Sequence, residues 1–513
     1  MNRITFLNAV TVFVLSASIS CAFGAAADSQ QNSAIVRFTV LDQVAAAPVH
    51  CRIHLTGPDS KPVLPEHLPS FHDHFCFDGD EQISLTPGTY TYVIERGPEY
   101  TRDSGTFQAQ EGTRIDVNST IRRIADLAAD GWWSGDLHIH RPPKDIELLV
   151  KAEDLHVAPI ITWWNASNAW KDAQLPAPTV RKFDDSCFCD LIAGEDERQG
   201  GAFMYFNVDS PLDITSAQPE YPCPLQFIEE ALKQPSAWID IEKPFWWDVP
   251  VALAHGYGNS IGLANNHCNH AGMLDSEAWG KPRDRQEFPS PHGNGLWTQQ
   301  IYYHILNTGI RIPPSAGSAS GVLPNPVGYN RVYVYTGEKR LNYENWWQNL
   351  RAGRCFVTNG PLIRTQANGQ IPGHIFKQPG GQDLNLTINL QIQTNDPIDR
   401  IEIIKNGIVE KTVANVQDPV ATLTFNKSGW FLIRAIADVP NTFRFASTAP
   451  YYVEIGDNKQ LISRNSAQFF LDWTKERIAR IKIEDKEKYR QVIKYHNRAQ
   501  EFWQTKLASA NAE

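Results

Sequence analysis

Apolar and polar residues alternate in short runs through residues 28–125. The alternation is clear at 36–40, 51–55 and 90–94, and turn-forming pairs such as Gly57-Pro58 separate the runs. A period of two indicates strands that bury one face and expose the other. Strands at this spacing predict an N-terminal β-sandwich over residues 28–125.

The pattern changes near residue 126, where short apolar runs alternate with stretches of helical spacing. A helix is predicted at 146–153, and buried strands are predicted at 157–164, 189–195, 202–206 and 249–256. Strands that alternate with helices are typical of a mostly parallel α/β sheet or barrel. We therefore expect an α/β domain over residues 126–340.

Alternating runs return from about residue 355, with Asn-Gly turns between them. They predict a C-terminal β-rich module over residues 341–462. Residues 463–513 have helical spacing, apolar at first and dominated by charge later, and predict a helical tail. The expected fold class is therefore multidomain, α/β plus all-β.

Residues 1–27 have the parts of an export signal. Arg3 supplies a positive charge, residues 4–19 a mostly apolar run, and residues 24–27 small side chains suited to cleavage. Cys21 leaves lipidation as an alternative. No later segment approaches the run of about 18 apolar residues that spans a membrane. We expect an exported protein, periplasmic or extracellular, with no transmembrane segment in the mature chain.

The charge balance narrows the range of partners. The 513-residue chain carries a formal net charge of −10. An acidic chain without a basic stripe does not release counterions from phosphates, which argues against a nucleic-acid partner. Its cysteines give no deducible disulfide pairing.

Two histidines separated by one residue, His138 and His140, lie at the end of an apolar run. On an extended segment their imidazoles project to the same side. Glu195 and His255 also end apolar runs, and strand C-termini carry the chemistry in α/β folds. Neutral imidazoles and a carboxylate suit zinc, with manganese or iron as alternatives. These four residues are the predicted metal ligands.

The N-terminal region has histidines of its own. The best metal candidate among them is His72-Asp73-His74, which lies in a predicted loop. For this triplet we favour a solvated or structural role over a metal site.

Five segments together carry a resemblance to a known family: 135–140, 193–195, 254–256, 311–318 and 352–361. They resemble motifs of the PHP superfamily (polymerase and histidinol phosphatase), in its CehA/McbA-like branch of secreted metallohydrolases. The resemblance covers about residues 130–365. It implies a distorted (β/α)7 barrel with up to three metal ions at the strand C-termini.

Two motifs depart from that family pattern. Where the family has Thr-Asp-His-Asn, this chain has Thr162-Trp163-Trp164-Asn165, and Ser318-Ala319-Ser320 replaces Asp-x-His. Tryptophan has no lone pair to donate, and serine is a poor neutral ligand. The departures imply one ion rather than three, and a pocket narrowed by aromatic rings. The predicted substrate contacts are Trp163, Trp164, Asn165 and Ser318.

The leading hypothesis is a secreted metal-dependent hydrolase that uses a metal-activated water on an ester, amide, carbamate or phosphoester bond. The candidates for substrate orientation or proton transfer are His267, His304, Asp136 and Arg331, and His267 is also a candidate additional ligand. The expected substrate is a small or carbohydrate-like molecule. The alternative is a non-catalytic carbohydrate or cell-envelope binding protein on a degenerate scaffold.

Overall fold

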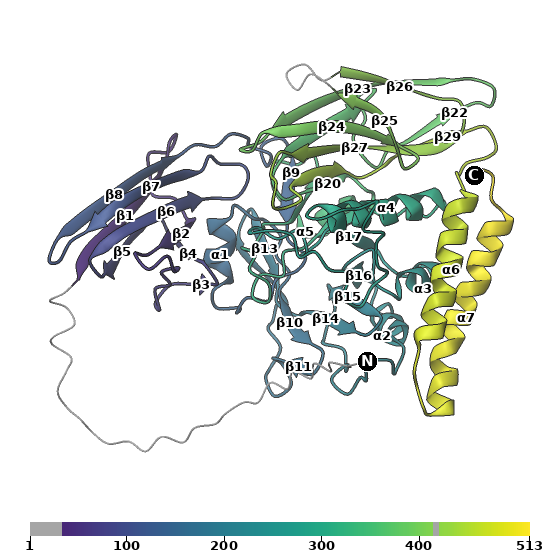
Figure 1. Ribbon diagram of the computed structural model, residues 1–513, viewed down its shortest axis with the longest axis horizontal. Helices are drawn as coiled ribbons and strands as arrows, with labels where there is room; N and C mark the ends of the chain where they lie inside the picture. The colour runs from purple at the N-terminus through teal and green to yellow at the C-terminus, as the bar shows by residue number, and fades with distance from the viewer. Residues whose placement is uncertain (1–32, 414–419) are drawn as a thin grey trace.

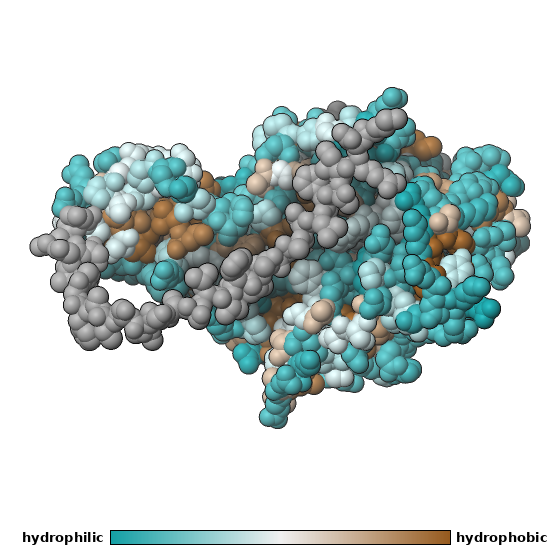
Figure 2. All heavy atoms as spheres, turned by 60° about the horizontal axis from the view of Figure 1, so that its bottom comes forward, coloured by the Kyte–Doolittle hydropathy of each residue, from teal (hydrophilic) through white to brown (hydrophobic). Residues whose placement is uncertain are grey.

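The computed structural model describes residues 33–413 and 420–513. The predicted export signal, residues 1–27 with Cys21, lies outside the described residues. Figure 1 shows an N-terminal β module, a central region of short strands and helices, a C-terminal β module, and two long helices at the far end. The face in Figure 2 is mostly hydrophilic, with apolar side chains in separate patches.

The N-terminal module consists of two sheets around one apolar core. One sheet has the order β5 (Asp80–Leu85), β1 (Ala34–Asp42), β8 (Arg114–Ile121). The other has the order β3 (Ser70–Phe71), β4 (His74–Phe77), β2 (Cys51–Thr56), β6 (Gly88–Glu95), β7 (Asp103–Ala109). Phe38 of β1 and Ile53 of β2 are fully buried in the shared core.

The central region holds a seven-stranded sheet and four helices. The strand order is β11 (Ser167–Asn168), β10 (Ile161–Trp164), β14 (Ala193–Arg198), β15 (Gly201–Phe206), β16 (Trp238–Ile241), β17 (Ser260–Ala264), β18 (Pro314–Ala316). The helices are α1 (Ile146–Ala152), α2 (Pro224–Ala231), α3 (Val249–Ala254) and α4 (Gly293–Asn307). A separate hairpin joins β12 (Val180–Asp184) to β13 (Cys187–Asp190).

The prediction of a (β/α)7 barrel was wrong. No sheet among the described residues is closed, and β15 pairs antiparallel with both β14 and β16. Only Gln199 and Gly200 separate β14 from β15. So short a link permits an antiparallel hairpin, whereas a parallel pair needs a crossover of about a dozen residues or more.

Residues 249–256 also differ from their predicted strand. They form the short helix α3, with His255 at its C-terminal cap. Pro250 occupies the first helical turn, where its missing N–H leaves no hydrogen bond unmade. Proline in the middle of a buried strand would instead break the ladder, so the helix is the better solution for this apolar run.

The C-terminal module has a nine-stranded sheet that extends into the central region. Its main path is β22 (Ile375–Gln378), β29 (Tyr451–Ile455), β27 (Gly429–Ala437), β28 (Phe445–Thr448), β20 (Cys355–Thr358), β19 (Arg331–Tyr335), β9 (Trp132–Gly135). Off this path, β24 (Ile398–Lys405) pairs with β27, and β25 (Ile408–Val413) pairs with β24. A three-stranded sheet contains β21 (Leu362–Ala367), β23 (Leu384–Gln393) and β26 (Val420–Phe425). Helix α5 (Tyr343–Arg351) connects β19 to β20. Because β9 and β19 belong to this sheet, the expected boundary at residue 340 does not separate two sheets.

The chain ends in α6 (Arg464–Arg480) and α7 (Lys486–Ala508), which pack against each other and against α3. Arg477 donates to the buried Asp248 carboxylate (Nε to Oδ1, 2.6 Å) and, through both terminal nitrogens, to Glu220. His496 of α7 lies 3.3 Å from the same Asp248 oxygen. None of the described helices has the length and apolar character needed to cross a bilayer.

We expect Arg477→Met to destabilise the attachment of the tail. The substitution leaves Asp248 buried without its guanidinium partner, and breaking a buried ion pair costs about 3–5 kcal/mol. Urea unfolding and limited proteolysis of the tail measure the loss. Arg490→Met, which removes an exposed pair with Glu487, is the control. Equal effects of the two substitutions would contradict the prediction.

The same contact predicts a pH dependence. Burial acts to raise the pKa of Asp248, but the Arg477 charge and the His496 contact hold it well below its usual range. A depressed folded-state pKa gives stability that is present above the unfolded value of about 3.9 and is lost as pH falls further. Proteolytic susceptibility of the tail should therefore rise below about pH 4 in the wild type. The Asp248→Asn variant should lack this acid-dependent increase.

Candidate metal centre

A buried carboxylate, that of Asp136, helps to hold the segment from Asp136 to His140 in place. Asp136 Oδ1 accepts from the backbone N–H of His138 and of Ser318 (3.0 Å each), and Oδ2 accepts from Gly328 (2.7 Å). Burial raises the pKa of Asp136. Asp136 was predicted to be catalytic. In the structure its carboxylate accepts hydrogen bonds from backbone N–H groups, so its role is to position the chain.

Isolated β-bridges also connect this segment to its neighbours on both sides. Ile139 bridges to Ile160 on one side and to Ser320 on the other. Its own side chain is fully buried. Because neighbours on an extended segment point to opposite sides, His138 and His140 then project together away from that core.

His138, His140 and Glu195 bring three ligand atoms together. The two Nε2 atoms lie 3.0 Å apart, and Glu195 Oε2 lies 3.5 Å from that of His138 and 3.2 Å from that of His140. Tetrahedral ligands about 2.1 Å from a zinc ion lie about 3.4 Å from one another. The spacing of the three atoms therefore fits a divalent ion.

A second carboxylate approaches His138 from its other side. Glu242, which directly follows β16, places Oε1 3.4 Å from His138 Nδ1. Its Oε2 accepts from Trp246 Nε1 (3.0 Å) and pairs with the buried Lys243 ammonium. A histidine that directs one nitrogen at an ion and the other at a carboxylate is a common arrangement at metal sites.

The charges of this group shift its pKa values in opposite directions. Burial alone would lower the pKa of His138, but Glu195 and Glu242 raise it to about 10. Burial opposes ionisation of Glu242, yet Lys243 and His138 lower its pKa to about 2. Burial outweighs Glu195 at His140 and lowers its pKa. The site is thus a compact cluster of paired charges.

Several buried atoms of this group support the presence of a ligand. Within the described residues, Glu195 Oε2, His138 Nδ1, Glu242 Oε1 and His267 Nδ1 have no hydrogen-bond partner. Buried polar atoms are normally satisfied, and exceptions call for an explanation such as an absent ion. The residues present therefore fit a divalent cation. His267 is buried, and its ring is tilted by 57° to that of Phe245, with the ring centres 5.3 Å apart. Burial and the charge of Lys243 lower the pKa of His267 to about 3.

Trp163 and Trp164 lie in different surroundings, one in the core and one beside the cluster. Trp163 is buried, donates from Nε1 to Ile192 O (2.7 Å) and lies against Gly194, where a Cβ atom would meet its ring at 1.9 Å. Trp164 lies with its ring 4.9 Å from that of His140. Trp164 therefore shields the cluster, whereas Trp163 is a core residue.

Asn165 and Ser318, the other expected substrate contacts, have different neighbours. Asn165 Oδ1 accepts from the backbone N–H of Glu197 (2.9 Å), and both residues line one cavity. Ser318 is fully buried, and its Oγ accepts from Asn330 N–H (2.9 Å). Ser318 therefore supports the loop that Asp136 binds.

Two of the expected site residues, His255 and His304, lie away from the cluster. His255 Nε2 contacts the backbone carbonyl of Tyr495 on α7 (3.0 Å). His304 of α4 contacts Ser466 Oγ (3.0 Å) and stacks on Phe469 of α6 (4.5 Å). The structure thus places both histidines at the attachment of the tail rather than beside His138.

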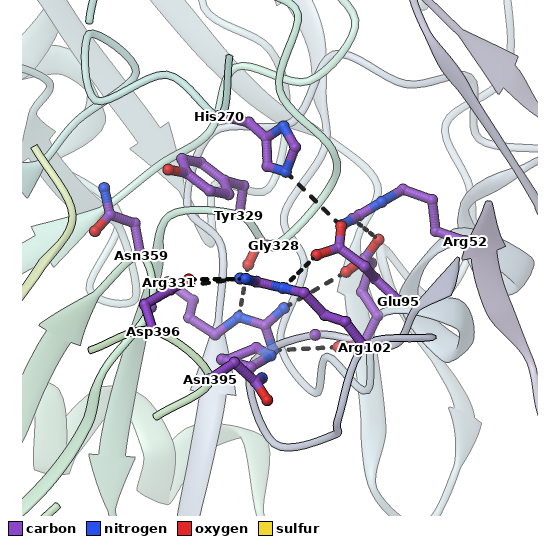
Figure 3. A pocket seen from close by; sticks show the side chains of 14 residues that line it. Arg52, Glu95, Arg102, His270, Gly328, Tyr329, Arg331, Asn359, Asn395 and Asp396 are labelled. Atoms are coloured by element: carbon purple, nitrogen blue, oxygen red, sulfur yellow. Dashed lines mark hydrogen bonds and ion pairs between the residues drawn. The ribbon is translucent and has the colours of Figure 1, made fainter. Parts of the chain in front are cut away.

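Arg331 lies in a different cavity, between the N-terminal module and the rest of the chain (Figure 3). Its Nε donates to Gly328 O (2.6 Å). Arg52, Arg102 and Glu95 also line this cavity. Both arginines form ion pairs with the Glu95 carboxylate. The cavity volume is about 40 Å³, enough for only a few water molecules.

Two further groups have ligand spacing: His54, Glu95 and His270, and His54, Asp73 and His74. All of these residues except His270 belong to the N-terminal module. Arg52 Nε donates to His54 Nε2 (3.1 Å). A neutral His54 that accepts there carries its proton on Nδ1 and offers no lone pair to an ion. Both groups need His54, so ion pairing explains them better than a metal.

Glu242 and Lys243 were missed in the sequence. The run before them, residues 237–241, is apolar apart from Asp240. A carboxylate directly after such a run is the same signal that marked Glu195, and it could have been recognised. Lys243 carried no such signal, because a buried lysine cannot be told from an exposed one by spacing.

Comparisons with known proteins do not place the chain. No family model and no curated protein matches it. Among solved structures, the fibronectin(III)-like modules of CbhA from Clostridium thermocellum match with a TM-score of 0.14 and 18% identity, over 17% of this chain and 93% of that chain. A TM-score this low says nothing about function, so the geometry of the site is the basis for assigning one.

We expect Glu242→Gln to weaken zinc binding about 10- to 100-fold, the usual cost of losing a carboxylate behind a ligating histidine. The amide keeps the shape of the side chain but loses the charge that orients His138. Competition with a chromophoric chelator measures the change in Kd. Glu229→Gln, beside Tyr257 and Tyr495, is the control. An unchanged Kd in Glu242→Gln would refute this role.

Proposed function

We propose that the protein is a metal-dependent hydrolase whose ion is held by His138, His140 and Glu195. The observation that carries the proposal is the convergence of two imidazole Nε2 atoms and one carboxylate oxygen within 3.5 Å of one another. Among the described residues, Glu195 Oε2 has no hydrogen-bond partner. The resemblance to the CehA/McbA-like branch, which rests in part on the same three residues, agrees with the proposal. Three protein ligands leave a coordination position open, as in catalytic zinc sites.

An ion in this site would supply Lewis acidity toward water and toward the oxygen of a scissile bond. The protein's own residues supply the rest. Glu242 and Lys243 fix the orientation of His138, and Trp164 limits the access of water to His140. Each of these roles depends on side chains already held by neighbours.

Glu197 is the candidate for proton transfer. It lies two residues beyond Glu195 on β14, on the same face of the strand. Burial, and after it the charge of Glu195, raises the pKa of Glu197 to about 7. A carboxyl group with a pKa near neutrality is suited to accept a proton and return it.

Metal content of the purified protein tests the proposal. Elemental mass spectrometry should find about one zinc, manganese or iron ion per chain in the wild type, and little in His138→Ala or His140→Ala. His255→Ala should keep its ion, because His255 contacts the tail. Hydrolysis of 4-nitrophenyl acetate and bis(4-nitrophenyl) phosphate should disappear with the ion and return when it is restored. A wild type without metal, after purification free of chelator, would refute the proposal.

A further inference from the structure

A cavity of about 340 Å³ is lined in part by Asp196 and Glu197, which follow Glu195 on β14. Its walls come from the ends of β10 and β14, the loop that follows β15, and the segment that contains Trp279. The volume is within the range of about 300–1,000 Å³ that is typical of small-molecule sites. The polar and aromatic side chains of its wall include those of Asn165, Glu197, Arg198, Thr215 and Trp279.

Two sets of contacts connect this cavity to the histidines. Asn165 directly follows Trp164, whose ring contacts His140, and its backbone N–H donates to Glu195 O (3.3 Å). On another side, the ring of Trp279 stacks on that of Trp246 (6.4 Å, 23°). Trp246 in turn donates to Glu242. Residues that line the cavity, Asn165 and Trp279, are therefore connected to the candidate metal centre through Trp164 and Trp246.

Trp279 is unusual in both exposure and backbone conformation. Its side chain is 54% exposed, although an indole gains more from burial than most side chains. Its φ angle is +63°, a left-handed conformation that is a genuine outlier for a bulky residue. Such outliers cluster at functional sites, where the surrounding structure maintains them. An exposed, strained aromatic residue at a cavity indicates a surface for a ligand.

The charges of the cavity disfavour an anionic ligand. Arg198 is its only cation, and Asp196 accepts from the guanidinium at 2.6 and 2.7 Å. The backbone carbonyl oxygens of Gln218 and Pro222 accept from Nη1 of the same guanidinium. Glu197 adds a carboxylate, while Asn165 and Thr215 add neutral hydrogen-bonding groups. The cavity thus favours a neutral ligand with several hydroxyl groups.

We propose that this cavity is the substrate subsite and binds a neutral sugar ring stacked on Trp279. Its role as a substrate subsite rests on the proposed hydrolase function. A sugar ring has an apolar C–H face and hydroxyl groups at its edge. The face matches the indole, and the edge matches the carboxylate, amide and hydroxyl groups of the wall. The bond to be cleaved would then be carried on a saccharide.

Titration of the full-length protein with neutral oligosaccharides tests the inference. The probes are an array of neutral and acidic glycans, followed by calorimetry with the neutral hexasaccharide that binds best. Trp279→Ala should weaken binding about tenfold, consistent with a stacking contribution near 1.5 kcal/mol. Trp279→Phe should retain most of the affinity. Tyr489→Ala on α7 controls for a distant aromatic, and circular dichroism verifies folding.

The outcomes separate this inference from the proposed function. Binding to no neutral glycan, a preference for acidic glycans, or no effect of Trp279→Ala would each overturn it, even if the protein holds its ion. Glycan binding by a wild type that holds no metal would overturn the hydrolase proposal and the substrate role together. Neutral-glycan binding that persists in metal-free His140→Ala, with metal present in the wild type, supports both.

Discussion

The candidate site depends on the buried carboxylate of Asp136. It accepts three backbone N–H groups from two distant parts of the chain, His138 on one side and Ser318 and Gly328 on the other. No strand ladder longer than isolated bridges holds residues 136–140. The carboxylate adds to the backbone hydrogen bonds that Asp136, Leu137 and His140 donate to neighbouring segments. Hydrogen bonds to a charged acceptor are roughly twice as strong as neutral ones, which suits so small a contact area.

Around that anchor, charges of opposite sign alternate. Glu195, His138, Glu242 and Lys243 follow one another at contact distances with little solvent between them. An unpaired charge in such surroundings is costly, but a paired one is held tightly. The same arrangement that makes the cluster stable without an ion also keeps two imidazoles and a carboxylate oriented toward one point. A preformed site of this kind loses little conformational entropy when a ligand binds.

The sequence was informative where local patterns decide structure. The alternating runs at 36–40, 51–55 and 90–94 lie in β1, β2 and β6. The His-x-His spacing brought His138 and His140 together, because a period of two is a property of any extended chain. Pairing direction was not predictable in this way, since it depends on the two-residue link between β14 and β15. His255 was misplaced for a similar reason: Pro250 favoured a helix over the expected strand. Burial of Lys243 is a tertiary property that no spacing reveals.

The shared sheet of the central and C-terminal regions also affects how the chain can fold during synthesis. β9 pairs with β19, which leaves the ribosome only after the whole central sheet has been made. Residues 136–140 directly follow β9, so the histidines remain without their anchor until that late pairing forms. Contacts between segments far apart in sequence form slowly, and unpaired edges are exposed to other chains meanwhile. In the N-terminal module, by contrast, the strands β1 to β8 pair only with one another. The metal-binding geometry therefore forms late, after β19 has been synthesised and has paired with β9.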